Sequence, residues 1–240
     1  MISYFPPVTG GASRPLSGGP MDLCAYQSGA FRADLRKYYR IEFGDRPPTL
    51  RRRVKLWITH LGLHCVAVYR LGRFARAVLA EGNPAGFPLF ILYEALAFFV
   101  KAIHHVDIFA ASIGPGFYIG HVGTIYIGKT RIGSNCSVTH NVTIGMGISG
   151  CSHGVPTLGD DVWVGAGSLL SGSISLGRGV AVNGGTFLTR SVPDRCLVGG
   201  NPGRVILTGY DNSALFGGRI PRDAEAGKAD ESTPRAETAV

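Results

Sequence analysis

Three histidines in the glycine-rich second half of the chain, His121, His140 and His153, are candidates for acid–base chemistry. The usual pKa of an imidazole lies near neutral pH, so histidine serves both as general base and as general acid. Such a group can take the proton of an attacking nucleophile and return a proton to a leaving group. Each histidine also has a structural explanation, as a corner residue or as a solvated loop residue.

A six-residue period organises the chain after Asp107. Successive sixes open with an aliphatic residue, often followed by glycine, as in Ile132-Gly133, Leu158-Gly159, Val164-Gly165 and Leu176-Gly177. Such a period predicts a short strand plus a turn per six residues, with three sixes closing one triangular coil. The aliphatic residues then stack inside the coils, and glycine supplies the turns. Because one coil spans about 18 residues, His140, 19 residues after His121, is expected to stack beside it.

Two interruptions of the period fall near the histidines. The segment 146–157 is too long and polar for a turn, so we predict an extruded loop that carries His153. Ile127 and Ile132 are five residues apart rather than six, which predicts a tighter corner.

The preceding part of the chain, residues 31–106, has helical periodicity and is predicted to form three or four helices. It holds 13 Lys/Arg against 5 Asp/Glu, which is the whole formal excess of +8. Such a basic segment suggests nucleic acid, acidic lipid or a phosphorylated substrate as partner, or simply solvated helix surfaces. The apolar run 87–103 is interrupted by Glu94 and Lys101 and is short for a membrane span, which favours a buried or interfacial helix.

The two end segments are predicted to be flexible, and the cysteines suggest a reducing compartment. Residues 1–30 are rich in Pro, Gly and Ser and are expected to be flexible, as is the tail 211–240. The five cysteines show no CxxC spacing, which argues against a disulfide framework. With no secretory signal pattern in residues 1–30, we expect a cytoplasmic protein.

The ordered motifs resemble those of hexapeptide-repeat acyltransferases, within them the serine acetyltransferase-like group. The motifs are Ile113–Gly123, Val142–Gly145, Pro156–Asp160, Val164–Gly167 and Gly200–Val205, with Gly62–His64 and Tyr69–Leu71 in the helical part. The resemblance implies a mainly β fold, a left-handed parallel β-helix over residues 107–210 preceded by a small α-helical domain. It also implies a homotrimer or a dimer of trimers, acetyl-CoA as acyl donor, and His121 as catalytic base.

Two departures from the group's pattern bear on the acceptor. Gly120 stands where the group usually has an aspartate, and Gly154-Val155 stand where it has Arg-His before the Pro-Thr-Leu-Gly block. The combination looks more like relatives from exopolysaccharide biosynthesis, so a sugar hydroxyl on a small or lipid-linked precursor is the first interpretation. L-Serine is the alternative. We expect no nucleic acid partner.

Other residues enter as candidates for the acceptor and donor sites. Asp45 loosely matches a substrate-side aspartate of the helical domain, and His140 and His153 could orient His121 or contact substrate. Small residues could let a pantetheine arm lie against the coils, and guanidinium groups pair well with phosphate. The donor-site candidates are Gly145, Gly165, Ala166, Gly167, Ser168, Gly184, Gly185, Arg190 and Arg204.

Two other classes of function remain to be weighed. Three histidines on such a fold raise a zinc hydratase of the γ-carbonic anhydrase kind, but the spacing of His121, His140 and His153 does not reproduce that pattern, so we expect no metal. A non-catalytic β-helix would have no use for a loop beside His121. Finally, a cluster of basic residues (Arg51–Arg53, Lys55, Arg70, Arg73, Arg76) together with the apolar run 87–103 suggests peripheral association with the inner face of a membrane.

Overall fold

A computed structural model describes residues 20–147 and 154–216, with side chains from residue 29. Four helices come first, α1 (Pro20–Phe43), α2 (Leu50–Thr59), α3 (Leu61–Ala80) and α4 (Gly86–His104). Fifteen strands follow: β1 (Val106–Ile108), β2 (Ser112–Ile113), β3 (Tyr118–Ile119), β4 (Ile125–Ile127), β5 (Arg131–Ile132), β6 (Ser137–Val138), β7 (Thr143–Gly145), β8 (Thr157–Leu158), β9 (Trp163–Val164), β10 (Leu169–Ser171), β11 (Ser175–Leu176), β12 (Ala181–Val182), β13 (Phe187–Leu188), β14 (Cys196–Gly199) and β15 (Arg204–Thr208). A 3₁₀ helix, Ser213–Phe216, comes last.

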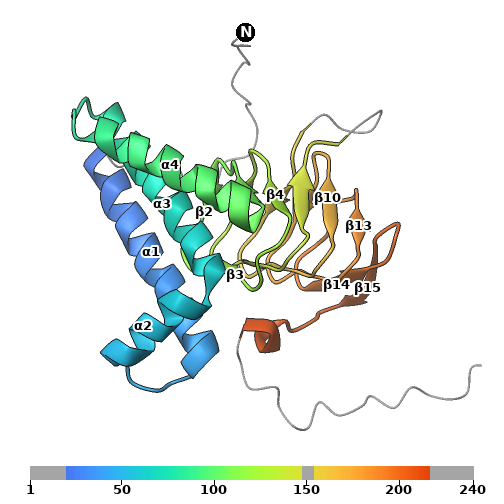
Figure 1. Ribbon diagram of the computed structural model, residues 1–240. Helices are drawn as coiled ribbons and strands as arrows, with labels where there is room; N and C mark the ends of the chain where they lie inside the picture. Colours follow the sequence, from blue (N-terminus) through green and yellow to red (C-terminus); the bar gives the residue numbers. More distant parts are fainter. Residues whose placement is uncertain (1–19, 148–153, 217–240) are drawn as a thin grey trace, which may run out of the picture.

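The strands form three parallel sheets that share one winding. Their orders are β1-β4-β7-β10-β13, β11-β8-β5-β2 and β15-β14-β12-β9-β6-β3, so each strand pairs with the strand one coil away. Among the strand pairs of the described residues, only β14 and β15 are antiparallel. This is the predicted left-handed parallel β-helix, with the four helices gathered at one end (Figure 1).

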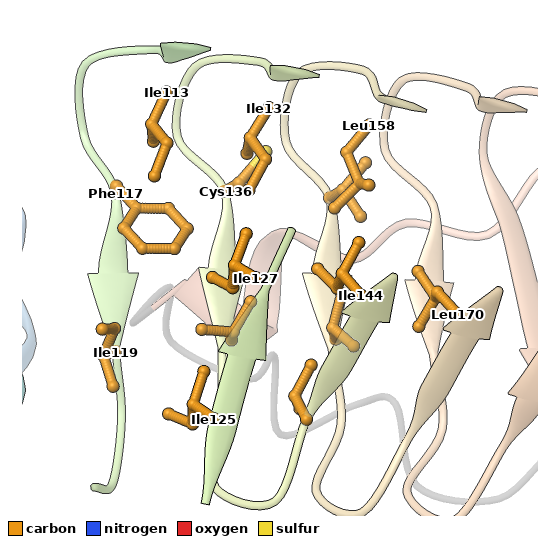
Figure 2. Close-up of a cluster of buried hydrophobic side chains, with 14 of the residues drawn as sticks. Ile113, Phe117, Ile119, Ile125, Ile127, Ile132, Cys136, Ile144, Leu158 and Leu170 are labelled. Atoms are coloured by element: carbon orange, nitrogen blue, oxygen red, sulfur yellow. The ribbon is translucent and has the colours of Figure 1, made fainter. Parts of the chain in front are cut away.

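The core of the β-helix follows the six-residue period. The aliphatic residues that open each six are at most 5% exposed, from Ile132 to Leu188. The fifth places are buried as well, and Cys136 and Val142 are 0% exposed there. Figure 2 shows these side chains stacking in ladders along the inside of the coils, with Ile113, Ile132 and Leu158 in one ladder. Each ladder removes apolar area from water at every coil, which stabilises the stack.

Both predicted interruptions fall where the structure leaves the regular winding. At the five-residue corner, Thr130 is fully buried, and its hydroxyl donates a hydrogen bond to the carbonyl of Pro156. Strand β7 ends at Gly145 and β8 begins at Thr157, so the six-residue winding stops between them. His153 lies outside the described residues.

The helical layer begins earlier in the chain than predicted. Helix α1 begins at Pro20, so residues 20–30 are helical rather than a flexible lead-in. Residues 211–216, the start of the predicted flexible tail, likewise have a defined structure, because they contain the 3₁₀ helix and the buried Asn212. In α3 the buried face includes Leu63, Val66 and Arg70, whereas Leu61 and Leu79 are exposed. The division into domains otherwise stays a prediction.

Helix α4 packs along α3 but keeps most of its apolar surface outside. Only Gly86 is buried in it, while Phe87, Phe98 and Ile103 are 62%, 67% and 64% exposed. By length and composition alone it is the one helix of the described residues that could cross a membrane, with a mean hydropathy of 1.7. The run is therefore longer than the sequence suggested, and it is no buried core helix.

Candidate active site

One edge of the β-helix carries most of the residues that the sequence proposed for chemistry. The chain turns at this edge in residues 120–124, 139–142, 165–168 and 183–186, each turn joining a strand of the six-stranded sheet to one of the five-stranded sheet. We call these four stacked turns the His121 edge. The first turn holds His121, the second His140, and the next two hold the proposed glycines.

The two described histidines of this edge are neighbours, as their spacing predicted. Their ring centroids are 6.0 Å apart with the planes at 68°, an edge-to-face arrangement. His121 is exposed, whereas His140 is partly buried and its Nδ1 has no hydrogen-bond partner among the described residues. A Cβ on Gly123 would approach the His140 Cβ to 3.1 Å, so glycine lets the two turns pack closely. The His140 backbone is fixed in turn, because its carbonyl accepts from the Gly167 N–H at 3.1 Å.

The small residues of the third and fourth turns stack directly on one another. The Gly185 N–H donates to the Ala166 carbonyl at 2.7 Å, and a Cβ on Gly165 would lie 2.6 Å from the Gly184 nitrogen. Gly167 and Gly185 also have φ values of 70° and 71°, which favour glycine. These backbone demands explain the glycines without a ligand. The glycines also leave a surface with few side chains, as an extended pantetheine arm requires.

Ser168 does not belong to that surface. It is 1% exposed, and its Oγ donates to the Asn183 carbonyl at 2.9 Å. The hydroxyl therefore satisfies a buried carbonyl inside the coil, at the fifth place of its six. Gly145 is likewise buried, at the end of β7, where its carbonyl accepts from the Gly172 N–H at 3.2 Å.

The two arginines proposed for phosphate are exposed. Arg190 lies beyond β13, and Arg204 opens β15 with its guanidinium donating to the Gly203 carbonyl at 3.1 Å. Neither makes an ion pair with a described residue. Both remain free to pair with an anion.

Asp45 is not placed beside His121. It is exposed in the connection between α1 and α2, and neither of the two grooves that it lines includes His121. No group of three or more His, Cys, Asp or Glu side chains that could hold a metal gathers among the described residues.

Tyr38 of α1 fixes the His121 segment, and no motif in the sequence pointed to it. Its hydroxyl accepts from the Ile119 N–H at 2.9 Å and donates to the Ile119 carbonyl at 3.2 Å, two residues before His121. Strand β3 is the outermost of its sheet, so these backbone groups have no further coil to pair with. Burial raises the pKa of Tyr38 well above its usual value, which keeps the hydroxyl protonated as a donor. Tyr38 thus makes the hydrogen bonds to Ile119 that a further coil would otherwise make.

A buried ion pair caps the same end of the β-helix. Arg70 Nε donates to Asp34 Oδ2 at 2.8 Å, and the two side chains are 4% and 0% exposed. Asp34 also accepts from the Phe117 N–H at 2.7 Å, and Arg70 donates to the carbonyls of Ile113 and Gly114. Burial raises the pKa of the Asp34 carboxyl, opposed by the Arg70 guanidinium. The prediction that Arg70 belongs to a membrane-facing basic cluster is therefore wrong, because its side chain is buried.

The sequence held a weak signal for this cap. Asp34, Lys37 and Tyr38 are spaced as one helix face, and so are Tyr69 and Arg70 on the face that carries Leu63 and Val66. Polar residues on an otherwise apolar helical face indicate buried hydrogen bonds. Their partners lie far away in the sequence, however, and only the structure identifies them.

Comparison with known proteins places the chain. No family model matches it. It is 37% identical to the serine acetyltransferase of Synechocystis over 185 residues, which are 76% of this chain and 71% of that protein. A match to serine acetyltransferase 3, mitochondrial, of Arabidopsis thaliana is 42% identical over 103 residues and spans only 26% of that protein. The chain belongs to the serine acetyltransferase family.

Solved structures agree with this assignment. A soybean serine acetyltransferase complexed with serine matches with a TM-score of 0.58 at 28% identity, covering 76% of this chain and 70% of that one. Serine acetyltransferase from Brucella abortus in complex with coenzyme A matches with a TM-score of 0.58 at 25% identity, covering 80% and 72%. The predicted class, an O-acetyltransferase with acetyl-CoA as donor, is confirmed.

Proposed function

We propose that the protein transfers the acetyl group of acetyl-CoA to the hydroxyl of L-serine, with His121 as general base. Family membership supports the acceptor, since the similar proteins and structures are serine acetyltransferases. They favour serine over the sugar hydroxyl that the sequence departures first suggested. The observation that carries the mechanism is the His121 edge, where His121, His140 and the glycine-rich turns at Gly165 and Gly184 follow one another from coil to coil.

The reaction places one proton at a time on His121. The imidazole takes the proton of the acceptor hydroxyl while that oxygen attacks the thioester carbonyl. The tetrahedral intermediate then expels the thiolate of coenzyme A, and the imidazolium returns the proton to that sulfur. The ester and the free thiol are the products. Because His121 is exposed on the edge, both substrates have access to it.

One assay separates the two acceptors. Thiol release from acetyl-CoA is followed with L-serine, and in parallel with nucleotide-linked and lipid-linked sugars. We expect saturable release with L-serine, and mass spectrometry should find O-acetylserine. Gly120 and Gly154-Val155, which depart from the family pattern, are the specific reason to include sugars. Release with a sugar and none with serine would refute the serine proposal and establish the other acceptor.

We propose further that the active unit is a trimer or a pair of trimers. The support is an exposed His121 on the outside of a single β-helix, which leaves the acceptor side open until a neighbouring subunit covers it. Multi-angle light scattering at assay concentration should give a mass of three or six chains of 25.4 kDa. An active monomer would contradict this.

For localisation we propose a cytoplasmic enzyme that rests on the inner face of a membrane through α4. Phe87, Phe98 and Ile103 are exposed on that helix, and apolar helices lying in the interface gain from such burial. Flotation with neutral and anionic vesicles tests it, with Phe98→Ser as the variant and Phe31→Ser as a partly buried control. If the protein floats with none of the vesicles, the membrane proposal is refuted, and the exposed apolar face of α4 would instead pack against another subunit.

A further inference from the structure

A groove of about 660 Å³ lies between α1, the connection after it and α2, and no residue of the His121 edge lines it. Five arginines line it: Arg32, Arg36, Arg40, Arg46 and Arg53. Three of them repeat every fourth residue along α1, so they share one helix face. The other two come from the connection and from α2. Three separate segments thus bring positive charge to one hollow.

Within residues 29–147 and 154–216, these arginines have no anionic partner. None of the five makes an ion pair with any described residue, whereas Arg70, Arg76 and Arg178 each do. Among the described residues that line the groove, Asp45 alone is acidic, and it is exposed. Like charges four residues apart destabilise a helix. Five guanidiniums against one carboxylate therefore leave an excess of about four charges for a bound anion to neutralise.

The walls of the groove are held in place before any ligand arrives. The Pro47 carbonyl accepts from the Tyr39 hydroxyl at 2.8 Å and from the Arg52 guanidinium at 2.7 Å, which ties the connection to both helices. Trp57 lines the groove and is fixed by stacking on His64, at 5.6 Å and 17°. A preformed site loses less entropy on binding than one that must be ordered.

We propose that this groove binds a compact organic polyphosphate, of the diphosphate class. One guanidinium donates two parallel hydrogen bonds to the oxygens of a phosphate. Two linked phosphates offer enough oxygens for several guanidiniums. A diphosphate monoester carries about three negative charges at neutral pH, close to the excess in the groove. Trp57 offers an apolar wall to the organic part. The proposal is independent of the acetyl acceptor and goes beyond it.

Two sources of such a group are distinguished by the probes. The full chain is titrated calorimetrically with inorganic pyrophosphate, with a nucleoside diphosphate, and with vesicles containing anionic phospholipid. We expect binding of both soluble probes, with the nucleoside diphosphate tighter because its base reaches Trp57. Binding to vesicles alone would overturn the proposal in favour of a general membrane surface.

Matched variants on one helix provide the control. Arg53 lines the groove, whereas Arg51, two residues earlier on α2, does not. Arg53→Gln should weaken pyrophosphate binding about tenfold, the usual worth of one charge-assisted hydrogen bond. Arg51→Gln makes the same charge change and should alter it less than twofold. Equal losses of pyrophosphate affinity in both variants would overturn the proposal, because they would show a general attraction to positive charge and no specific site.

Acetyl-CoA supplies the second check, since it also carries a diphosphate. Saturating pyrophosphate should leave the KM for acetyl-CoA unchanged, and Arg36→Gln should lower pyrophosphate affinity without changing that KM. Competition between pyrophosphate and acetyl-CoA would make the groove part of the donor site and refute a separate one. These readouts hold whichever acceptor the transfer assay identifies.

Discussion

The β-helix and the helical layer are held together in different ways. Inside the β-helix each buried residue repeats the role of the residue one coil away, as Ile144 and Leu170 do at 0% exposure. In the helical layer single polar side chains make contacts that occur once, such as Tyr38 to Ile119 and Asp34 to Phe117. The repeat builds the surface that carries His121. The single contacts close its open end and fix the strand before His121.

Because of this difference, the residues that carry the chemistry are distinct from those that stabilise the end of the β-helix. The exposed His121 side chain points out of the repeat and can change without disturbing the ladders. A side chain of the polar cap is buried against the end coil, so its loss leaves backbone groups unpaired.

His121→Ala should lower kcat/KM by about two to four orders of magnitude, the usual contribution of a general base. Because His121 is exposed and makes no core contact, the melting temperature should stay near that of the wild type. Steady-state kinetics and calorimetry measure the two quantities. His140→Ala should lose less activity, since that ring lies beside His121 and is not proposed to take the proton. Wild-type activity in His121→Ala would remove it as the base.

Arg70→Met should lower the free energy of unfolding by about 3–5 kcal/mol, because it leaves Asp34 buried without its cation. Arg178→Met is the control in the β-helix. Arg178 is 73% exposed and pairs with Asp161, so its removal should change stability by less than about 1 kcal/mol. Denaturant melts of both variants compare a cap pair with a surface pair. Equal small losses would mean that the cap does not hold the end coil.

Tyr38→Phe keeps the ring and removes only the hydroxyl. The Ile119 N–H and carbonyl then lose their partner, which should lower stability by about 1–3 kcal/mol. Because Ile119 lies two residues before His121, kcat should fall as well, with KM for acetyl-CoA unchanged. Tyr126→Phe changes a tyrosine on the outside of β4, 43% exposed, and should affect neither quantity.

The same comparison explains what the sequence revealed. The six-residue period located the ladders and both interruptions because every coil repeats the same demand for an inward aliphatic residue. The stacking of His140 on His121 followed from the length of one coil. The cap had no period, so Tyr38 and Asp34 escaped notice, and Arg70 was assigned to the surface by its charge alone. Asp45 was carried over from a loose motif match, and the structure puts it in the arginine-lined groove instead.

The smallest expected effect is a dependence of stability on pH that comes from the cap. Lys37 is 9% exposed, and its Nζ donates to the carbonyls of Asn135 and Cys136 at 2.7 and 3.1 Å. Burial lowers the pKa of Lys37 to about 7, from 10.5. Above pH 7 the unfolded chain therefore binds more protons than the folded one, and stability rises with pH until about 10.5. Burial raises the pKa of Cys65 and Cys136 to about 12, which lowers stability above pH 9.

The window from pH 7 to pH 9 isolates the lysine. Urea unfolding there should show stability rising by at most about 2 kcal/mol. Lys37→Met should flatten the rise, because the group that titrates is gone. Lys129→Met, an exposed lysine of the β-helix, should keep it. A flat profile in the wild type would mean that water reaches the Lys37 ammonium, and that the helical layer caps the end coil less tightly than the coils pack on one another.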